Sequence, residues 1–151
     1  MTFQVVDLRA APQHAARVTD WLWQAFGNRE SRDFFASIVD ASLRNGDYPV
    51  TWLALDGDRP VGTVGLWRCD LISRQDLFPW LAALYVDPDA RGQGVSERLQ
   101  RAVIACARGR GHQHLYLYSA CADYYERFGW RYIGDGLDYP ATPVRLYQRA
   151  L

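Results

Sequence analysis

The 151-residue sequence contains no lysine, because all 17 of its basic residues are arginine. Without lysine the chain has neither a lysine nucleophile nor a Schiff-base residue. It also has no phosphate-binding P-loop, whose motif ends in G-K-[ST]. The 17 acidic residues bring the formal net charge to zero, which argues against a nucleic-acid or membrane-surface partner.

Cysteines and long apolar runs are also scarce. The three cysteines are odd in number, widely spaced and form no C-x-x-C pair, so neither a metal site nor a disulfide framework is expected. A reducing compartment fits this pattern, and we expect a cytoplasmic protein. The N-terminus lacks the basic start and apolar run of a signal peptide. No segment approaches the roughly 18 apolar residues that span a bilayer.

The composition is 49% hydrophobic, 23% charged and 14% aromatic, as in a soluble globular protein. The length predicts one domain over residues 1–151. Periodicity and turn residues predict strands and helices in the order β-α-α-β-β-β-α-β-α-β-β. Among these elements are a strand over Trp80–Val86, a short helix over Ala122–Phe128 and a loop over Gly136–Pro143.

The stretch Trp80–Leu99 organises the chain. An apolar strand ends at Asp87-Pro88, the chain turns through Arg91-Gly92-Gln93-Gly94, and an amphipathic helix follows. A glycine-rich turn before a helix N-terminus presents free backbone N–H groups to an anion. The dinucleotide fingerprint G-x-G-x-x-G is excluded, because Glu97 stands at the third glycine position.

The residues Leu84-Tyr85-Val86-Asp87-Pro88 and Arg91-Gly92-Gln93-Gly94-Val95-Ser96 resemble the GCN5-related N-acetyltransferase (GNAT) superfamily and its pattern V-x-P-x-x-R/Q-x-x-G-x-G/A. A second segment, Tyr124–Trp130, resembles that family's Y-E-x-x-G-F/W. The predicted element order agrees over nearly the whole chain. The resemblance implies an α/β (α+β) fold with a mixed, mostly antiparallel central sheet of about six or seven strands. Helices would cover both faces, and the fourth and fifth strands would splay apart.

The same resemblance implies acetyl-CoA as co-substrate, with no metal. Backbone amides at the helix start would hold the CoA pyrophosphate, and the strand before the turn would pair with the pantetheine arm. Ser96 departs from the family's Gly or Ala, but it is still small, and its hydroxyl can cap the helix or donate to phosphate. The implied CoA-binding residues are Leu84, Tyr85, Val86, Arg91, Gly92, Gln93, Gly94, Val95 and Ser96.

Direct acetyl transfer needs a neutral amine, a donor for the oxyanion and a proton for the departing thiolate, but no enzyme nucleophile. Tyr125 aligns with the family's tyrosine near the thioester and is the predicted general acid. The strand Trp80–Val86 carries no carboxylate for a general base. Asp70 and Asp76, just before that strand, are candidates acting through water, and Glu30 is another.

The candidate residues lining the acceptor pocket are Trp21, Phe26, Phe34, Trp67, Trp80 and Tyr118. The carboxylates that can attract a cationic amine are Asp70, Asp76, Asp135 and Asp138. We therefore expect an N-acetyltransferase acting on a primary amine of a small molecule or peptide, as a monomer or homodimer. One alternative is a non-catalytic acyl-CoA-binding or sensing module on the same fold. Others are transfer to a hydroxyl or use of a longer acyl group.

Overall fold

The computed structural model describes residues 2–151. Its ten main elements follow the expected order except at one helix. They are β1 (Gln4–Asp7), α1 (Ala15–Phe26), α2 (Arg32–Ser42), β2 (Val50–Asp56), β3 (Arg59–Trp67), β4 (Trp80–Val86), α3 (Val95–Gly109), β5 (His114–Ser119), β6 (Arg131–Asp138) and β7 (Thr142–Ala150). No helix within residues 2–151 is long and apolar enough to cross a membrane.

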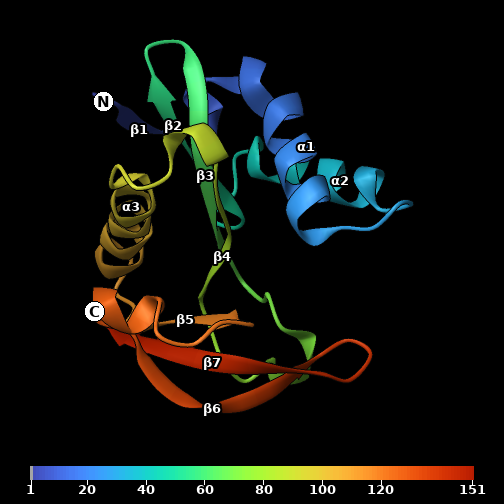
Figure 1. Ribbon diagram of the computed structural model, residues 1–151, viewed down its shortest axis with the longest axis vertical. Helices are drawn as coiled ribbons and strands as arrows, with labels where there is room; N and C mark the ends of the chain where they lie inside the picture. Colours follow the sequence, from blue (N-terminus) through green and yellow to red (C-terminus); the bar gives the residue numbers. More distant parts are fainter. Residues whose placement is uncertain (1) are drawn as a thin grey trace.

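The strands form one seven-stranded sheet in the order β1-β2-β3-β4-β5-β7-β6 (Figure 1). Every neighbouring pair is antiparallel except β4 and β5, which are parallel. A parallel neighbour requires a crossover connection, and α3 supplies it. The mixed, mostly antiparallel sheet predicted from the sequence is confirmed.

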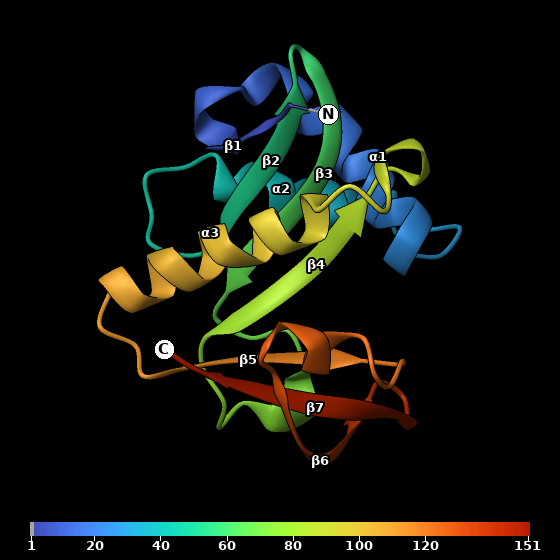
Figure 2. The ribbon, with the colours of Figure 1, turned by 60° about the vertical axis from the view of Figure 1, so that its left-hand side comes forward.

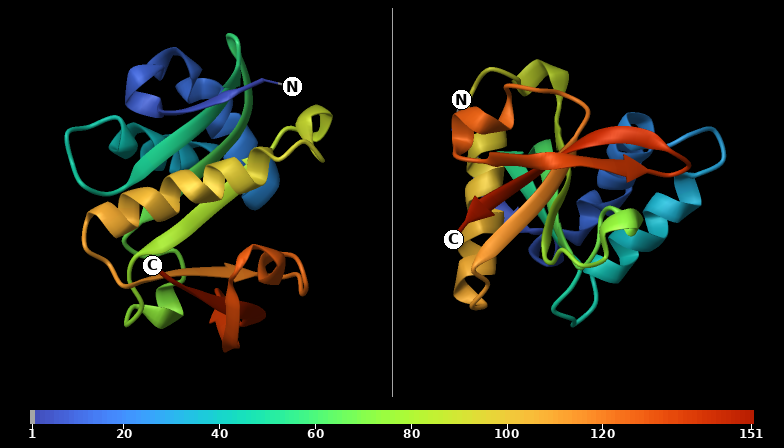
Figure 3. Two further views of the ribbon diagram at one scale, coloured as in Figure 1. Left: turned by 90° about the vertical axis from the view of Figure 1, so that its left-hand side faces the viewer. Right: turned by 90° about the horizontal axis from the view of Figure 1, so that it is seen from below.

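Helices cover both faces of the sheet, as expected. The helices α1 and α2 lie on one face and α3 on the other (Figures 1 and 3). The buried stripe of α3 includes Val95, Leu99 and Val103, which pack on the central strands. Gly62 of β3 permits this approach, because a Cβ there would lie 3.0 Å from both Leu99 and Val95. A second core, with Val18 and Leu22 of α1, fills the other face.

Two segments differ from the sequence prediction. Ala122–Phe128 forms only a 3₁₀ turn over Tyr125–Phe128, which ends at Gly129 in the left-handed conformation. The predicted loop over Gly136–Pro143 is mostly strand, because β6 continues to Asp138 and β7 begins at Thr142. Cross-strand pairing, which the local sequence does not reveal, extends this hairpin.

The parallel strands β4 and β5 separate almost at once. Their ladder holds a single pair, Trp80 with Tyr116, and Figure 2 shows the strands diverging beyond it. On its other side β4 contains a bulge where Ala83 adopts a positive φ of 54° and the pairing with β3 shifts. The splay and the bulge leave backbone groups of β4 without a strand partner.

Candidate active site

The turn between β4 and α3 is shaped by two left-handed glycines. Gly92 and Gly94 have φ values of 77° and 84°, a region that other residues enter at a cost. A Cβ at either position would meet no atom within 4 Å, so conformation and not crowding selects glycine. No side chain within residues 2–151 caps the first turn of α3. Its N–H groups therefore face open space, with the positive end of the helix dipole behind them.

The side chains of this turn hold it against the strand. Arg91 lies across the Tyr85 ring, with 5.7 Å from guanidinium to ring centroid, and its Nε donates to the Val86 carbonyl at 3.0 Å. Tyr85 itself packs against Trp21 of α1, and the Val95 side chain is buried in the core. The turn therefore offers a ligand mainly its backbone amides and the remaining N–H groups of Arg91.

Ser96, the departure from the family pattern, begins a polar network. Its Oγ accepts hydrogen bonds from the Tyr124 hydroxyl at 2.6 Å and from Gln100 Nε2 at 3.2 Å. Gln100 is buried, and its Oε1 accepts from Trp130 Nε1 at 3.0 Å. The two hydroxyls carry two hydrogens, and the bond between them uses one. One donor therefore remains, at the first turn of α3, beside the free amides.

A cavity of about 960 Å³ opens where β4 and β5 splay apart. One part of its wall comes from the diverging strands, including Ala83, Leu84, Leu117 and Ser119. Another part comes from α1 and α2, including Phe26, Phe34, Phe35 and Ile38. The charged lining residues are Arg68, Asp70 and Asp138.

Four of the predicted pocket residues line this cavity, namely Phe26, Phe34, Trp67 and Tyr118. Trp21 does not, because it is buried against Tyr85. Trp80 does not reach its surface, because the indole is fully buried and donates its Nε1 hydrogen to the Leu77 carbonyl. It packs beneath Tyr118, with ring centroids 6.4 Å apart. Trp80 therefore supports the cavity from the core.

Tyr125 lies in the 3₁₀ turn after β5 and lines the cavity. Its ring packs on Trp130 and Tyr147. Within residues 2–151 its hydroxyl has no hydrogen-bond partner, whereas that of the adjacent Tyr124 is bound to Ser96. Burial raises the pKa of Tyr125, and nearby groups including Asp70 add to this. The phenol therefore stays protonated at neutral pH and is available as a donor.

Asp70 lies just beyond β3 and lines the same cavity. No hydrogen bond or ion pair reaches its carboxylate from residues 2–151. Burial, together with the negative charge of Asp138, raises the pKa of Asp70 to about 7. Both carboxylates also raise the pKa of Tyr118, after the larger effect of that residue's own burial. A carboxyl group with a pKa near 7 can gain and lose a proton at physiological pH.

The other acidic candidates lie elsewhere. Asp76 is exposed and bound by Arg74 through two hydrogen bonds of 3.0 and 2.9 Å, and this pairing lowers its pKa. Asp135 is exposed and accepts the Tyr132 hydroxyl at 2.7 Å, and Glu30 is exposed after α1. The structure brings Asp70 and Asp138, but none of these three, to the cavity.

Sequence reasoning missed one wall, which Tyr48 and Arg68 form. The Arg68 guanidinium lies 4.9 Å from the centroid of the Tyr48 ring, and that of Arg110 lies 4.8 Å from it. The Tyr48 hydroxyl is hydrogen-bonded to His112. No sequence motif marks Tyr48, because it belongs to the connection between α2 and β2 and meets its partners only through the fold.

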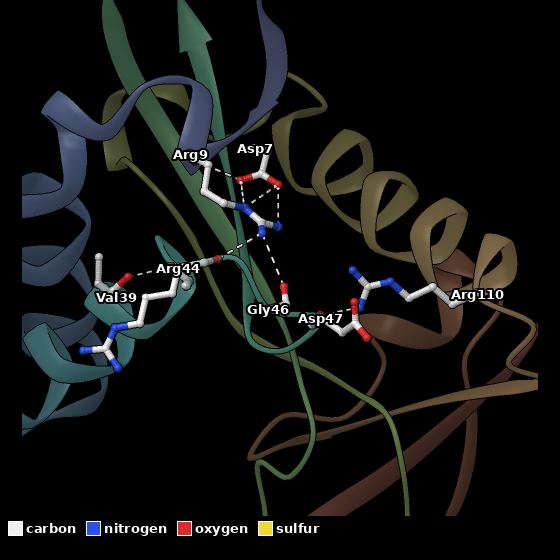
Figure 4. Close-up of polar contacts among 8 residues, drawn as sticks. Asp7, Arg9, Val39, Arg44, Gly46, Asp47 and Arg110 are labelled. Carbon is white, nitrogen blue, oxygen red and sulfur yellow. Dashed lines mark hydrogen bonds and ion pairs between the residues drawn. The ribbon is translucent and has the colours of Figure 1, made fainter.

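This connection is held from two sides, as Figure 4 shows. Arg9 donates to the carbonyls of Arg44 and Gly46 at 3.2 and 3.3 Å, and the Asp7 carboxylate fixes the Arg9 guanidinium. From the other side, Arg110 donates to the Asp47 carbonyl. Tyr48, the next residue, is thereby anchored in the cavity wall.

All three cysteines are free thiols. Among the described residues, no group of three or more His, Cys, Asp or Glu side chains is arranged to hold a metal ion.

Comparison with known proteins agrees with this geometry. Residues 15–130 match the family model of the acetyltransferase (GNAT) family. N-alpha-acetyltransferase 30 of Schizosaccharomyces pombe is 30% identical over an alignment of 100 residues, and the match covers 58% of this chain and 66% of that protein.

Two solved structures have the same fold. A GNAT-family protein from Desulfovibrio desulfuricans has a TM-score of 0.78 at 18% identity, with 99% of each chain covered. A GNAT-family acetyltransferase from Elizabethkingia anophelis with acetyl-CoA bound has a TM-score of 0.69 at 16% identity, over 99% of this chain and 98% of that one. Since the family model matches most of the chain, this protein belongs to the acetyltransferase (GNAT) family of acyltransferase enzymes.

Proposed function

We propose that this protein transfers an acetyl group from acetyl-CoA directly to a primary amine. One observation carries the proposal. A carboxylate with a pKa of about 7, Asp70, and a protonated phenol without a partner, Tyr125, line the same cavity. That cavity opens at the free edge of β4, and β4 leads directly to the amide-rich turn before α3.

The residues around the turn fit coenzyme A. Open space beside Gly92 and Gly94 leaves room for a pyrophosphate, which the first amides of α3 and Arg91 would bind. Each N–H bond to a charged acceptor contributes about 1.5–3 kcal/mol. The edge of β4 at Leu84 and Val86 has no strand partner, although Arg91 Nε donates to the Val86 carbonyl, and it would hold the pantetheine amides as an added strand does. When bound, acetyl-CoA supplies the activated acetyl group.

Asp70 would remove a proton from the acceptor amine. A primary amine of pKa near 10 enters mainly as an ammonium, which cannot attack a carbonyl carbon. The carboxylate takes one of its protons, directly or through a water molecule. The amine nitrogen then bonds to the acetyl carbon as the carbon–sulfur bond breaks, and the nitrogen releases its second proton to water to give the neutral amide.

Tyr125 would complete the reaction. Its hydroxyl donates a proton to the departing thiolate, and the resulting phenolate regains one from solvent. Because burial disfavours the phenolate, this donor is always in its protonated form at rest.

The test combines binding with turnover. Acetyl-CoA is titrated calorimetrically, and free thiol is then measured against a panel of primary amines. Tyr125→Phe is expected to lower kcat about 100-fold with an unchanged dissociation constant for acetyl-CoA. Absence of acetyl-CoA binding would contradict the proposal. Binding without thiol release on any amine would instead support a non-catalytic acyl-CoA-binding module.

A further inference from the structure

We infer that the acceptor carries one ammonium group on an apolar body, and that the cavity disfavours dicationic and strongly polar amines. The inference rests on the proposed function and concerns which amines that site selects. Three features of the cavity carry it: its apolar rim, its charge balance and the fixed position of its one guanidinium.

The rim of the cavity exposes large apolar side chains. Phe26, Phe34 and Ile72 are 53%, 61% and 75% exposed, and all three line the cavity. They come from α1, α2 and the 3₁₀ turn after β3, so the fold gathers them from separate segments. Phe35 and Ile38 continue this surface inward. An exposed apolar surface that runs into a cavity is typical of a site for an apolar ligand group.

The charges within the cavity suit a single cation. Asp70 and Asp138 contribute two negative charges when ionised, and Arg68 contributes one positive charge. The balance of one negative charge matches one ammonium group. Asp138 has a role of its own here, since its charge both attracts the ammonium and makes Asp70 a stronger base.

Arg68 opposes a second ammonium. Its guanidinium is stacked on the Tyr48 ring, and it also lies 6.0 Å from the centroid of Phe78. Arg9 and Arg110 hold the connection that carries Tyr48 (Figure 4). The positive charge is therefore kept at the wall, where a diamine would place its second group against either a cation or the apolar rim.

Two classes of acceptor carry one ammonium group on an apolar body. One is a free amine with an aryl or alkyl group, and the other is a peptide whose first residue is apolar. The test measures kcat/KM by thiol release for 2-phenylethylamine, ethanolamine and 1,3-diaminopropane. It also includes tripeptide amides that begin with Phe or with Ser. The apolar member of each set is expected to exceed its polar counterpart by about tenfold or more. The ratio between the best amine and the best peptide identifies the source.

Two variants test the apolar rim and the Arg68 guanidinium of the cavity. Phe34→Ser should lower kcat/KM for 2-phenylethylamine about fivefold and leave ethanolamine unaffected. The matched control is Leu137→Ser, which alters a side chain that is 52% exposed but does not line the cavity. It should change neither value. Arg68→Gln should raise kcat/KM for 1,3-diaminopropane about threefold or more, relative to the monoamines.

The outcomes separate the two proposals. If no amine releases thiol, the proposed function fails. If thiol is released but ethanolamine or 1,3-diaminopropane matches 2-phenylethylamine, and the Ser-first peptide matches the Phe-first peptide, acetyl transfer stands and the inference about the acceptor is wrong. An equal response of both amines to Phe34→Ser would overturn it as well.

Discussion

The turn before α3 and the cavity between β4 and β5 are built in opposite ways. The turn is one continuous stretch, residues 84–96, and presents mainly backbone groups to a ligand. The cavity is assembled from side chains of α1, α2, β3, β4, β5, β6 and β7 and of the connections between them. A backbone site recognises what all acyl-CoA molecules share, whereas a side-chain site can select one acceptor.

The two regions also differ in the sign of the charge that they present and in its dependence on pH. At the turn, free N–H groups and Arg91 provide positive potential with little dependence on pH. In the cavity, the burial of Asp70, together with the negative charge of Asp138, raises the Asp70 pKa into the physiological range. Variants of the cavity should therefore change rates and pH dependence, and variants of the turn should change affinity for CoA.

The largest effect is expected for Asp70→Asn. Without the proposed general base, kcat/KM should fall about 100-fold or more, while acetyl-CoA affinity is unchanged. In the unaltered protein, kcat/KM should rise with pH through about 7 as Asp70 loses its proton. Retention of that rise in Asp70→Asn would assign the base to another group.

The same variant should be more stable at high pH. The folded-state pKa of about 7 lies above the unfolded value near 4, so the folded state binds the proton more tightly. The stabilisation this gives is complete below about pH 4 and is lost as pH rises through 7. Asp70→Asn should therefore exceed the original protein by about 1–3 kcal/mol at pH 8 and match it at pH 4, as measured by urea unfolding.

A smaller effect is expected at the turn. Gly94→Ala forces an alanine into the left-handed region and should cost about 1 kcal/mol of stability. It should also weaken CoA binding about tenfold, because the new Cβ enters the open space beside the free amides. Gly57→Ala is the control, since Gly57 has a φ of 62° and equally open surroundings in the β2–β3 turn. Equal CoA binding by both variants would show that Gly94 is needed only for its backbone conformation and not for the space beside it.

The smallest effect concerns the hydroxyl pair of Ser96 and Tyr124, which links the first turn of α3 to the residue just before Tyr125. Ser96→Ala and Tyr124→Phe should each weaken CoA binding about threefold. The first variant removes the Ser96 hydroxyl, which keeps a free hydrogen to donate, and the second removes the Tyr124 hydroxyl that donates to Ser96 Oγ. In a double-mutant cycle the pair should show a coupling of about 1 kcal/mol in unfolding free energy. Tyr132→Phe, which removes an exposed hydroxyl bond to Asp135, should leave CoA binding unchanged. Fully additive effects would mean that the pair does not act as a unit.

The turn was largely predictable from the sequence, because every feature it needs is local. Strand-type residues end at Asp87-Pro88, glycines follow, and the apolar period of α3 begins at Val95. The hairpin of β6 and β7 was less accessible, since Gly134, Gly136 and Pro143 resemble loop residues until the strands pair. The short helix expected over Ala122–Phe128 is reduced to a 3₁₀ turn over Tyr125–Phe128, and Asp123, two residues before that turn, has a positive φ of 68°.

The composition of the cavity was predictable only in part. Tyr125 follows from a motif, but nothing local separates Asp70 from Asp76, which lie six residues apart in an irregular segment. Burial beside Asp138 distinguishes the first, and pairing with Arg74 the second. Trp80 shows the converse, because an aromatic residue at the right sequence position is buried in the core beneath the cavity.

The single pair between Trp80 and Tyr116 is a seam. It joins two smaller sheets, β1 to β4 and β5 to β7, each of which is complete in its own antiparallel ladder. The gap between them therefore breaks no other ladder and opens without loss of regular pairing on either side. Asp138 and Tyr125 belong to the second unit, whereas Arg68, Asp70 and the turn before α3 belong to the first, so the cavity takes its polar groups from both sides of this seam.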